Sequence, residues 1–165
     1  MTQHRLLIIW HSRTGGSEAL AQAAARGAAG EAGVAVDLRR ADDVDAAALL
    51  AANGYLFVAP ENLASLSGAM KEMFDRHYYD CLGQLEGRAY ATIICAGSDG
   101  TGAQRQIDRI ATGWRLRRVA EGMIVITGAQ TGEAIWAAKL IDAADLAAAE
   151  ELGAALSAGL AAGIY

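Results

Sequence analysis

The sequence predicts an α/β domain built on a five-stranded parallel β-sheet that is covered by helices on both faces. Five short apolar runs alternate along the chain with five stretches in which apolar residues recur at helical spacing. Such an alternation favours right-handed crossovers and therefore parallel strands. The first run, residues 6–10, contains no polar residue, as expected for a strand buried on both faces. With 165 residues, the chain has the length of one domain, expected over residues 1–165.

The first half of the chain supplies three strands and two helices. In chain order we expect strand 6–10, helix 16–31, strand 34–38, helix 42–52 and strand 54–59. In the first helix, a stripe of mostly small residues favours close packing against the sheet, and it consists of Leu20, Ala23, Ala24 and Gly27. Pro60 is expected to end the third strand because it has no backbone N–H to donate.

The second half supplies two strands and three helices. We expect helix 67–79, strand 89–95, helix 101–114, strand 123–127 and helix 143–162. Apolar spacing predicts the buried faces of these helices, which are Met70, Met73, Phe74 and His77, then Ile107, Ile110, Ala111 and Trp114, and finally Leu146, Ala149, Gly153 and Leu156.

The composition excludes several classes of protein. Apolar residues make up 53% of the chain and aromatic residues only 6%, because 38 residues are alanine. This apolar content argues against a disordered chain, and the counts of 19 Gly and 1 Pro argue against a collagen-like one. The net charge of −5 disfavours general binding to nucleic acid.

Signals for membranes, metals and disulfides are also missing from the sequence. The apolar run at residues 6–10 is too short to span a bilayer, and no signal-peptide layout precedes it. The three histidines do not have the spacing of a metal site, so we expect no metal. Cys81 and Cys95 form no C-x-x-C pair, and we expect them to stay reduced in a cytoplasmic protein.

Ligands of such sheets bind outside the carboxyl ends of the strands, where the strand order reverses. The loop after the first strand is Ser12-Arg13-Thr14-Gly15-Gly16-Ser17. Its hydroxyls, its glycines and the start of a helix suit a phosphate group. The loop lacks the lysine of a P-loop and the G-x-G-x-x-G of a dinucleotide fold. The alternative is a plain turn in which Ser17 or Thr14 caps the helix.

The loops after the third and fourth strands face the same crevice. The second loop begins with Pro60, Glu61, Asn62 and Leu63, which offer a polar rim and an apolar face to a flat heterocycle. The third contains Gly97, Ser98, Asp99 and Gly100, and its glycines indicate a backbone that passes close to another group. Taken singly, each loop is equally compatible with an ordinary capped turn.

Together, the three loops resemble those of the flavodoxin-like proteins. The pattern Ser12-x-Thr14-Gly15-x-Ser17 is similar to their flavin-phosphate loop. Residues 60–76 and 96–104 resemble the second and third loops of their NAD(P)H-dependent FMN and quinone reductase branch. The resemblance implies a flavodoxin-like three-layer sandwich with strand order 2-1-3-4-5, and FMN as the cofactor.

The resemblance also implies a set of cofactor-binding residues. Residues of the first loop would hold the phosphate, namely Ser12, Arg13, Thr14, Gly15, Gly16 and Ser17. Residues of the second would line the isoalloxazine, namely Pro60, Glu61, Asn62 and Leu63. Residues of the third would reach its pyrimidine edge, namely Gly97, Ser98, Asp99 and Gly100.

Two departures from the flavodoxin pattern favour an enzyme over an electron carrier. Residues 61–67 contain no glycine, so the peptide flip that stabilises the one-electron form of the flavin in flavodoxins is disfavoured. The second and third loops contain no aromatic residue to sandwich the ring, so one face stays open. We therefore predict an NAD(P)H-dependent oxidoreductase that passes two electrons through FMN to a quinone, a flavin or a similar acceptor, with no catalytic side chain.

Two alternatives stay open at this point. One is a one-electron carrier of the flavodoxin type, and the other is a cofactor-free binding or regulatory module of the same fold. The expected partners of the enzyme are NAD(P)H and a small-molecule acceptor, with no nucleic acid and no membrane. A homodimer is compatible with the resemblance.

Overall fold

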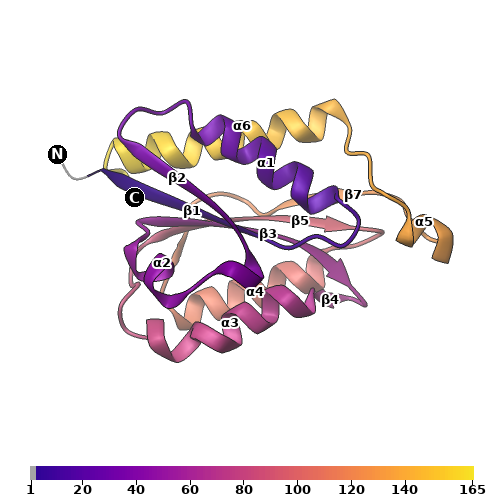
Figure 1. Cartoon of the computed structure of the whole chain (residues 1–165), viewed down its shortest axis with the longest axis horizontal. Coiled ribbons are helices and arrows are strands. Elements are labelled where there is room, and N and C mark those ends of the chain that lie inside the picture. Colours follow the sequence, from indigo (N-terminus) through magenta and orange to yellow (C-terminus); the bar gives the residue numbers. More distant parts are fainter. Residues whose placement is uncertain (1–2) are drawn as a thin grey trace.

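The computed structural model describes residues 3–165, so that residues 1 and 2 of the expected domain lie outside the described part. A central sheet lies between two helical layers (Figure 1). The strands are β1 (His4–Trp10), β2 (Val34–Arg40), β3 (Gly54–Asn62), β4 (Ser65–Leu66), β5 (Ala89–Ala96), β6 (Arg117–Arg118) and β7 (Met123–Ile126). The helices are α1 (Gly16–Ala28), the 3-10 helix η1 (Ala41–Asp43), α2 (Ala46–Ala51), α3 (Gly68–Cys81), α4 (Thr101–Gly113), α5 (Gly132–Trp136) and α6 (Ala143–Ala161).

The order of the sheet confirms the predicted topology. It runs β2-β1-β3-β5, and both β6 and β7 pair with the far edge of β5. These pairs are all parallel, and β7 corresponds to the fifth predicted strand. The chain therefore reverses direction across the sheet between β1 and β3, which places the switch point beside the first loop.

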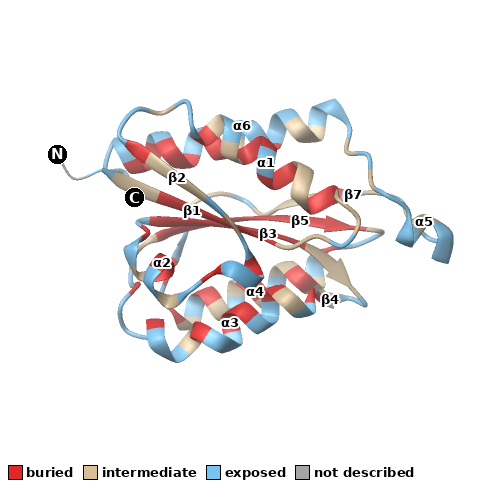
Figure 2. Cartoon of the chain, in the orientation of Figure 1, coloured by how far each residue is buried: buried red, intermediate tan, exposed pale blue. Residues whose placement is uncertain are grey.

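Alternation along the strands separates two apolar layers. Leu7, Ile9 and Phe57 pack with residues of α3 and α4 on one face. Leu6 and Ile8 pack on the other face with residues of α1 and α6. The central strands are buried along most of their length (Figure 2). This accounts for the absence of polar residues in the first apolar run.

The small residues of α1 serve its contact with another helix as well as with the sheet. A Cβ added to Gly27 would lie 1.9 Å from the carbonyl oxygen of Glu150 in α6. A Cβ added to Gly153 would lie equally close, at 1.9 Å, to the carbonyl oxygen of Ala24. The two backbones approach this closely only because both positions are glycine. Gly27 therefore faces α6, whereas Leu20 joins the apolar layer under the sheet.

Two expectations about local structure were wrong. The predicted helix 42–52 is broken into η1 and α2, because Asp45 accepts a hydrogen bond from the Ala48 N–H at 2.7 Å and caps a new helix start. The third strand does not end at Pro60 but continues to Asn62. Pairing with β1 stops at Val58, so the strand edge at residue 60 has no neighbour that needs its N–H.

Three short elements were not expected from the sequence. They are β4, β6 and α5. Strand β4 pairs antiparallel with the end of β3, so the second loop is a β-hairpin rather than an open loop. Helix α5 lies at the carboxyl end of the sheet (Figure 1), where Ile135 and Trp136 border the candidate site, as do the residues 63 and 64 that precede β4.

Candidate functional site

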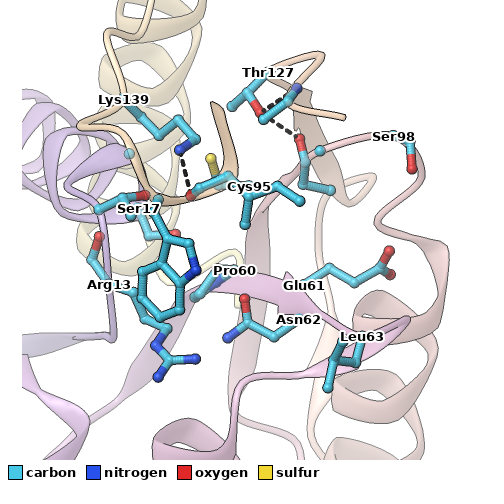
Figure 3. A pocket seen from close by; sticks show the side chains of 18 of the residues that line it. Arg13, Ser17, Pro60, Glu61, Asn62, Leu63, Cys95, Ser98, Thr127 and Lys139 are labelled. Carbon is cyan, nitrogen blue, oxygen red and sulfur yellow. Dashed lines mark hydrogen bonds between the residues drawn. The ribbon is translucent and has the colours of Figure 1, made fainter. Parts of the chain in front are cut away.

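A cavity of about 540 Å³ opens at the carboxyl ends of β1, β3 and β5, within the range of small-molecule sites. Figure 3 shows its wall. It brings together most of the predicted residues, namely Ser12, Arg13, Thr14, Gly16, Ser17, Pro60, Glu61, Asn62, Leu63, Gly97 and Ser98. Three predicted residues are not part of the wall, namely Gly15, Asp99 and Gly100.

The first loop forms a cradle at the start of α1. Gly15 precedes the helix with φ +94°, a left-handed conformation that favours glycine, and its N–H donates to the Ser12 hydroxyl at 2.9 Å. No side chain caps α1, so neither Ser17 nor Thr14 plays the capping role considered as the alternative. The positive end of the helix dipole therefore lies at the cavity, and the acidic residue of the first turn, Glu18, is not part of the cavity wall.

Within the described part of the chain, Ser17 has an unpartnered hydroxyl at this cradle. Its side chain is buried, and its hydroxyl has no hydrogen-bond partner within residues 3–165. A buried hydroxyl without a partner is unfavourable, because it has lost its hydrogen bonds to water. Ser17 lies on the cavity wall, where an anionic oxygen would satisfy it. The cradle thus fits a phosphate group.

The segment after β7 provides a wall that the sequence analysis missed. The backbone N–H of Lys139 donates to the Thr14 carbonyl at 2.8 Å, which ties this segment to the first loop. The Lys139 ammonium donates to the carbonyls of Ala134, Ile135 and Ala137 at 2.6–2.9 Å. Its charge is thereby used to hold α5. The other unexpected wall residues are Ala64, Cys95, Ala96, Thr127, Ala129, Gln130, Ile135 and Trp136.

Part of this wall had a signal in the sequence. Residues 127–130 follow the fifth strand, so the rule that places ligands at carboxyl ends of strands also covered them. The position of residues 132–139 had no such signal, because it depends on contacts with the first loop.

At the mouth of the cavity, Arg13 stacks on an aromatic ring. Its guanidinium lies 5.1 Å from the ring centroid of Trp136, a cation–π geometry. The Arg13 side chain runs away from Ser17 (Figure 3). Within residues 3–165, Arg13 forms no salt bridge. It thus presents a free positive charge at the mouth instead of inside the cradle.

The second loop is a tight hairpin with an exposed tip. Asn62 pairs with Ser65, and the two residues between them, Leu63 and Ala64, have φ values of +54° and +59°. Leu63 is fully exposed at the rim. Glu61 lies on the cavity wall, and its carboxylate accepts hydrogen bonds from the N–H groups of Gly100 and Ala103 at 2.9 and 3.1 Å. Glu61 therefore joins the second loop to the start of α4.

The third loop is held by the segment after β7. The Gly97 carbonyl accepts from the Gly128 N–H at 2.9 Å, and a Cβ at Gly97 would lie 2.8 Å from the Ala129 carbonyl oxygen. The Asp99 carboxylate accepts from the hydroxyl of Thr101 at 2.8 Å and is turned to solvent. Only Gly97 and Ser98 of this loop reach the cavity.

The titratable groups near the cavity are held in unreactive states. Burial raises the pKa of the Cys95 thiol to about 11, so it stays protonated at neutral pH. Burial lowers the pKa of His11, whose Nδ1 lies 2.9 Å from the Ser67 hydroxyl. Within residues 3–165 no group of three His, Cys, Asp or Glu residues is placed to hold a metal ion.

The cradle, the open cavity and the sheet order are accompanied by a match to a family model. The model of the family "NADPH-dependent FMN reductase" matches residues 5–131. The chain belongs to this family. It is an FMN-binding flavodoxin-like protein, and the cavity described above has the cradle that such a cofactor requires.

Individual relatives of this FMN reductase family member include flavodoxins. A flavodoxin of Aquifex aeolicus (strain VF5) is 34% identical over 98 residues, which is 59% of this chain and 51% of the flavodoxin. The match therefore spans about half the length of that relative.

Solved structures support the fold. An archaeal flavodoxin has a TM-score of 0.78 at 15% identity and covers 95% of this chain and 99% of its own. A flavodoxin, WrbA-like protein from Agrobacterium tumefaciens has a TM-score of 0.68 at 18% identity, with 94% and 96% covered. The flavodiiron core of Flv1 from Synechocystis sp. PCC6803 has a TM-score of 0.78 at 18% identity and covers 98% of this chain but 37% of its own. None of the helices in residues 3–165 has the length and apolar character needed to cross a membrane.

Proposed function

We propose that this protein is an NAD(P)H-dependent oxidoreductase that passes two electrons through FMN to a quinone, a flavin or a similar small acceptor. The observation that carries the proposal is the composition of the two loops that would flank the ring. The wall residues from the second and third loops include no aromatic side chain, so nothing from these loops sandwiches the ring. The exposed faces that remain suit a hydride donor and an acceptor.

We assign the residues that would hold the cofactor from their positions on the wall. Ser12, Thr14, Gly16 and Ser17 would surround the phosphate, which meets the start of α1. The wall residues that would line the ring are Pro60, Asn62 and Leu63 of the second loop and Gly97 and Ser98 of the third. Glu61, Asp99 and Gly100 would shape these loops without touching the ring.

When bound, FMN supplies the redox chemistry, in which NAD(P)H, a proton and a quinone give NAD(P)⁺ and the quinol. The wall offers no free acid or base for this reaction. Glu61 is bound to two amides, Lys139 to three carbonyls, and the Cys95 thiol keeps its proton. The protein would therefore bind and orient, and the proton would come from water.

Arg13 is the residue we assign to the hydride donor. It is the free cation of the wall, and it lies at the mouth rather than in the cradle. A guanidinium binds phosphate oxygens through paired N–H groups. Arg13 would thus hold a phosphate of NAD(P)H while the loop around Ser17 holds that of FMN.

The one-electron carrier is the second candidate, and one observation favours it. Leu63 and Ala64 already occupy positive φ, so the lack of glycine does not prevent the hairpin from adopting such a conformation. The matched flavodoxins point the same way. The cofactor-free alternative is set aside, because the family binds FMN and the buried Ser17 hydroxyl has no hydrogen-bond partner within residues 3–165.

Anaerobic titration separates the two candidates. The FMN-loaded protein is mixed with NADPH and then with a quinone, and absorbance is followed. We expect oxidation of NADPH, loss of the flavin absorbance in one step and its return with quinone. No oxidation of NADPH, together with accumulation of a one-electron flavin spectrum on reduction by dithionite, would favour the carrier.

We also propose that residues 1–165 form one domain in a cytoplasmic protein. Residues 3–165 share one sheet, and both cysteines are free and buried. A second copy could cover the exposed tip at Leu63, and analytical ultracentrifugation tests for a dimer.

A further inference from the structure

We propose that Glu61 is a positioning residue that clamps the second loop to α4 and holds Leu63 and Ala64 in a strained turn beside the cofactor site. The proposal concerns the bound FMN and does not depend on the identity of the hydride donor. It assigns to Glu61 a role through other residues, because its carboxylate is bound to backbone amides of α4.

The turn itself is unusual for its sequence. Strands β3 and β4 are joined by two residues, both with positive φ, which is the geometry of a type I′ hairpin turn. Asn-Gly and Gly-Gly are typical there, because a Cβ crowds the backbone in this region. Leu63 and Ala64 both carry that Cβ. Non-glycine residues keep such conformations only where the surroundings enforce them.

Contacts on both sides of the turn supply that constraint. Before the turn, Glu61 accepts from the N–H groups of Gly100 and Ala103. After it, the Gln106 side-chain oxygen accepts from the Leu66 N–H at 2.6 Å and from the Ser65 hydroxyl at 3.1 Å. The hairpin is therefore attached to the first two turns of α4 at each end.

The turn also packs directly on α4. A Cβ at Gly102 would lie 2.2 Å from the carbonyl oxygen of Ala64, so only glycine allows this approach. At the start of α4, Gly100 offers no side-chain cap and the Asp99 carboxylate accepts from the Thr101 N–H at 3.3 Å, whereas the N–H groups of Gly100 and Ala103 are bound by Glu61. Glu61 thus caps the helix from another strand, and a carboxylate is favoured at this end of the helix dipole.

The clamp has a consequence for the cofactor. Asn62 and Leu63 belong to the cavity wall, as do Gly97 and Ser98 of the third loop. Because Glu61 joins the two loops, they should move as one body. The orientation of the turn toward the ring is then set by the hydrogen bonds that Glu61 makes to backbone amides at the start of α4.

The test compares Glu61→Gln with Glu86→Gln, an exposed glutamate outside the wall and the clamp. The glutamine places an NH₂ group opposite a backbone N–H, so at least one of the two bonds is lost. We expect the Kd of FMN, measured by flavin fluorescence quenching, to rise about 10-fold in E61Q and to stay unchanged in E86Q. Hydrogen exchange of amides 62–66 should become faster in E61Q, and the midpoint potential of the bound flavin should shift.

A rescue variant distinguishes positioning from simple destabilisation. Asn-Gly adopts the turn without help, so Leu63→Asn with Ala64→Gly should restore amide protection of residues 62–66 in the E61Q background, and FMN affinity should then match that of the same turn variant with Glu61 intact. Gln106→Ala removes the other half of the clamp and serves if E61Q does not fold. Unchanged affinity and exchange in E61Q would overturn the proposal. So would failure of the Asn-Gly turn to rescue it, because Glu61 would then only cap α4.

Discussion

Arg13 and Trp136 come from opposite ends of the sequence, and the guanidinium of one lies 5.1 Å from the ring centroid of the other. Their stack joins the first loop to α5 across the mouth of the cavity. A ligand entering there would thus meet a cation and an indole. This pair gives the mouth a chemical character distinct from that of the neutral cradle behind it.

Replacing Arg13 should affect the hydride donor more than FMN. For Arg13→Gln we expect the KM for NADPH to rise about 10-fold with little change in kcat, because a charge-assisted phosphate contact is lost. Steady-state kinetics measure this, and Arg105→Gln on the exposed side of α4 is the control. A higher Kd for FMN with an unchanged KM for NADPH would instead assign Arg13 to the cofactor phosphate.

Removing the Ser17 hydroxyl should weaken FMN binding without unfolding the protein. Its hydroxyl is buried without a partner, so Ser17→Ala should leave the apo-protein as stable as before or slightly more stable. The Kd of FMN should rise about 5-fold to 10-fold. Ser157 in α6 is a matched control, because its hydroxyl is also buried without a partner, within residues 3–165. An equal loss of FMN affinity in Ser157→Ala would contradict a local role for Ser17.

The close contact between α1 and α6 should be intolerant of a methyl group. In Gly153→Ala the new Cβ would meet the Ala24 carbonyl oxygen, so the helices must separate. We expect a loss of about 1–3 kcal/mol in the free energy of unfolding, measured by urea denaturation. Gly30→Ala is the control, since its Cβ would find nothing closer than 3.4 Å. Equal stability of the two variants would show that the helices adjust freely.

Stability should fall at alkaline pH as the buried thiols titrate. Burial raises the pKa of Cys95 from 9.0 to about 11 in the folded protein. Between these values the unfolded chain loses the proton and the folded chain keeps it. Unfolding is therefore favoured as pH rises, by up to about 1.4 kcal/mol per pH unit for one such group. Urea denaturation of Cys95→Ala from pH 8 to pH 11 should show a shallower decline than the wild type, and an unchanged slope would refute this assignment.

Periodicity in the sequence predicted the parallel strands and the two helical layers because these follow from burial, whereas the strand order came from the resemblance to flavodoxin-like proteins. Leu6–Trp10 contains no polar position, and the buried residues of α3, Met70 and Phe74, recur at helical spacing. Such patterns indicate which faces of the strands and helices become buried when the chain folds. The residues of the first loop also predicted a phosphate-binding site, because hydroxyls and glycines at the start of a helix suit a phosphate group.

The remaining parts of the site depend on contacts that periodicity does not record. Pro60 normally ends a strand, and only the end of pairing with β1 explains why β3 continues. The role of Glu61 required knowing that α4 begins beside the hairpin. Lys139 is held at the wall by a backbone hydrogen bond to Thr14, and no sequence motif predicts this contact.

The match to the family model ends at residue 131, just before α5. The stretch that carries Trp136 and Lys139 thus lies outside the part of the chain that the family model matches, although it forms part of the cavity wall. Replacing that stretch with the corresponding segment of a relative should change which small molecules enter the cavity, while the first loop continues to bind the riboflavin phosphate.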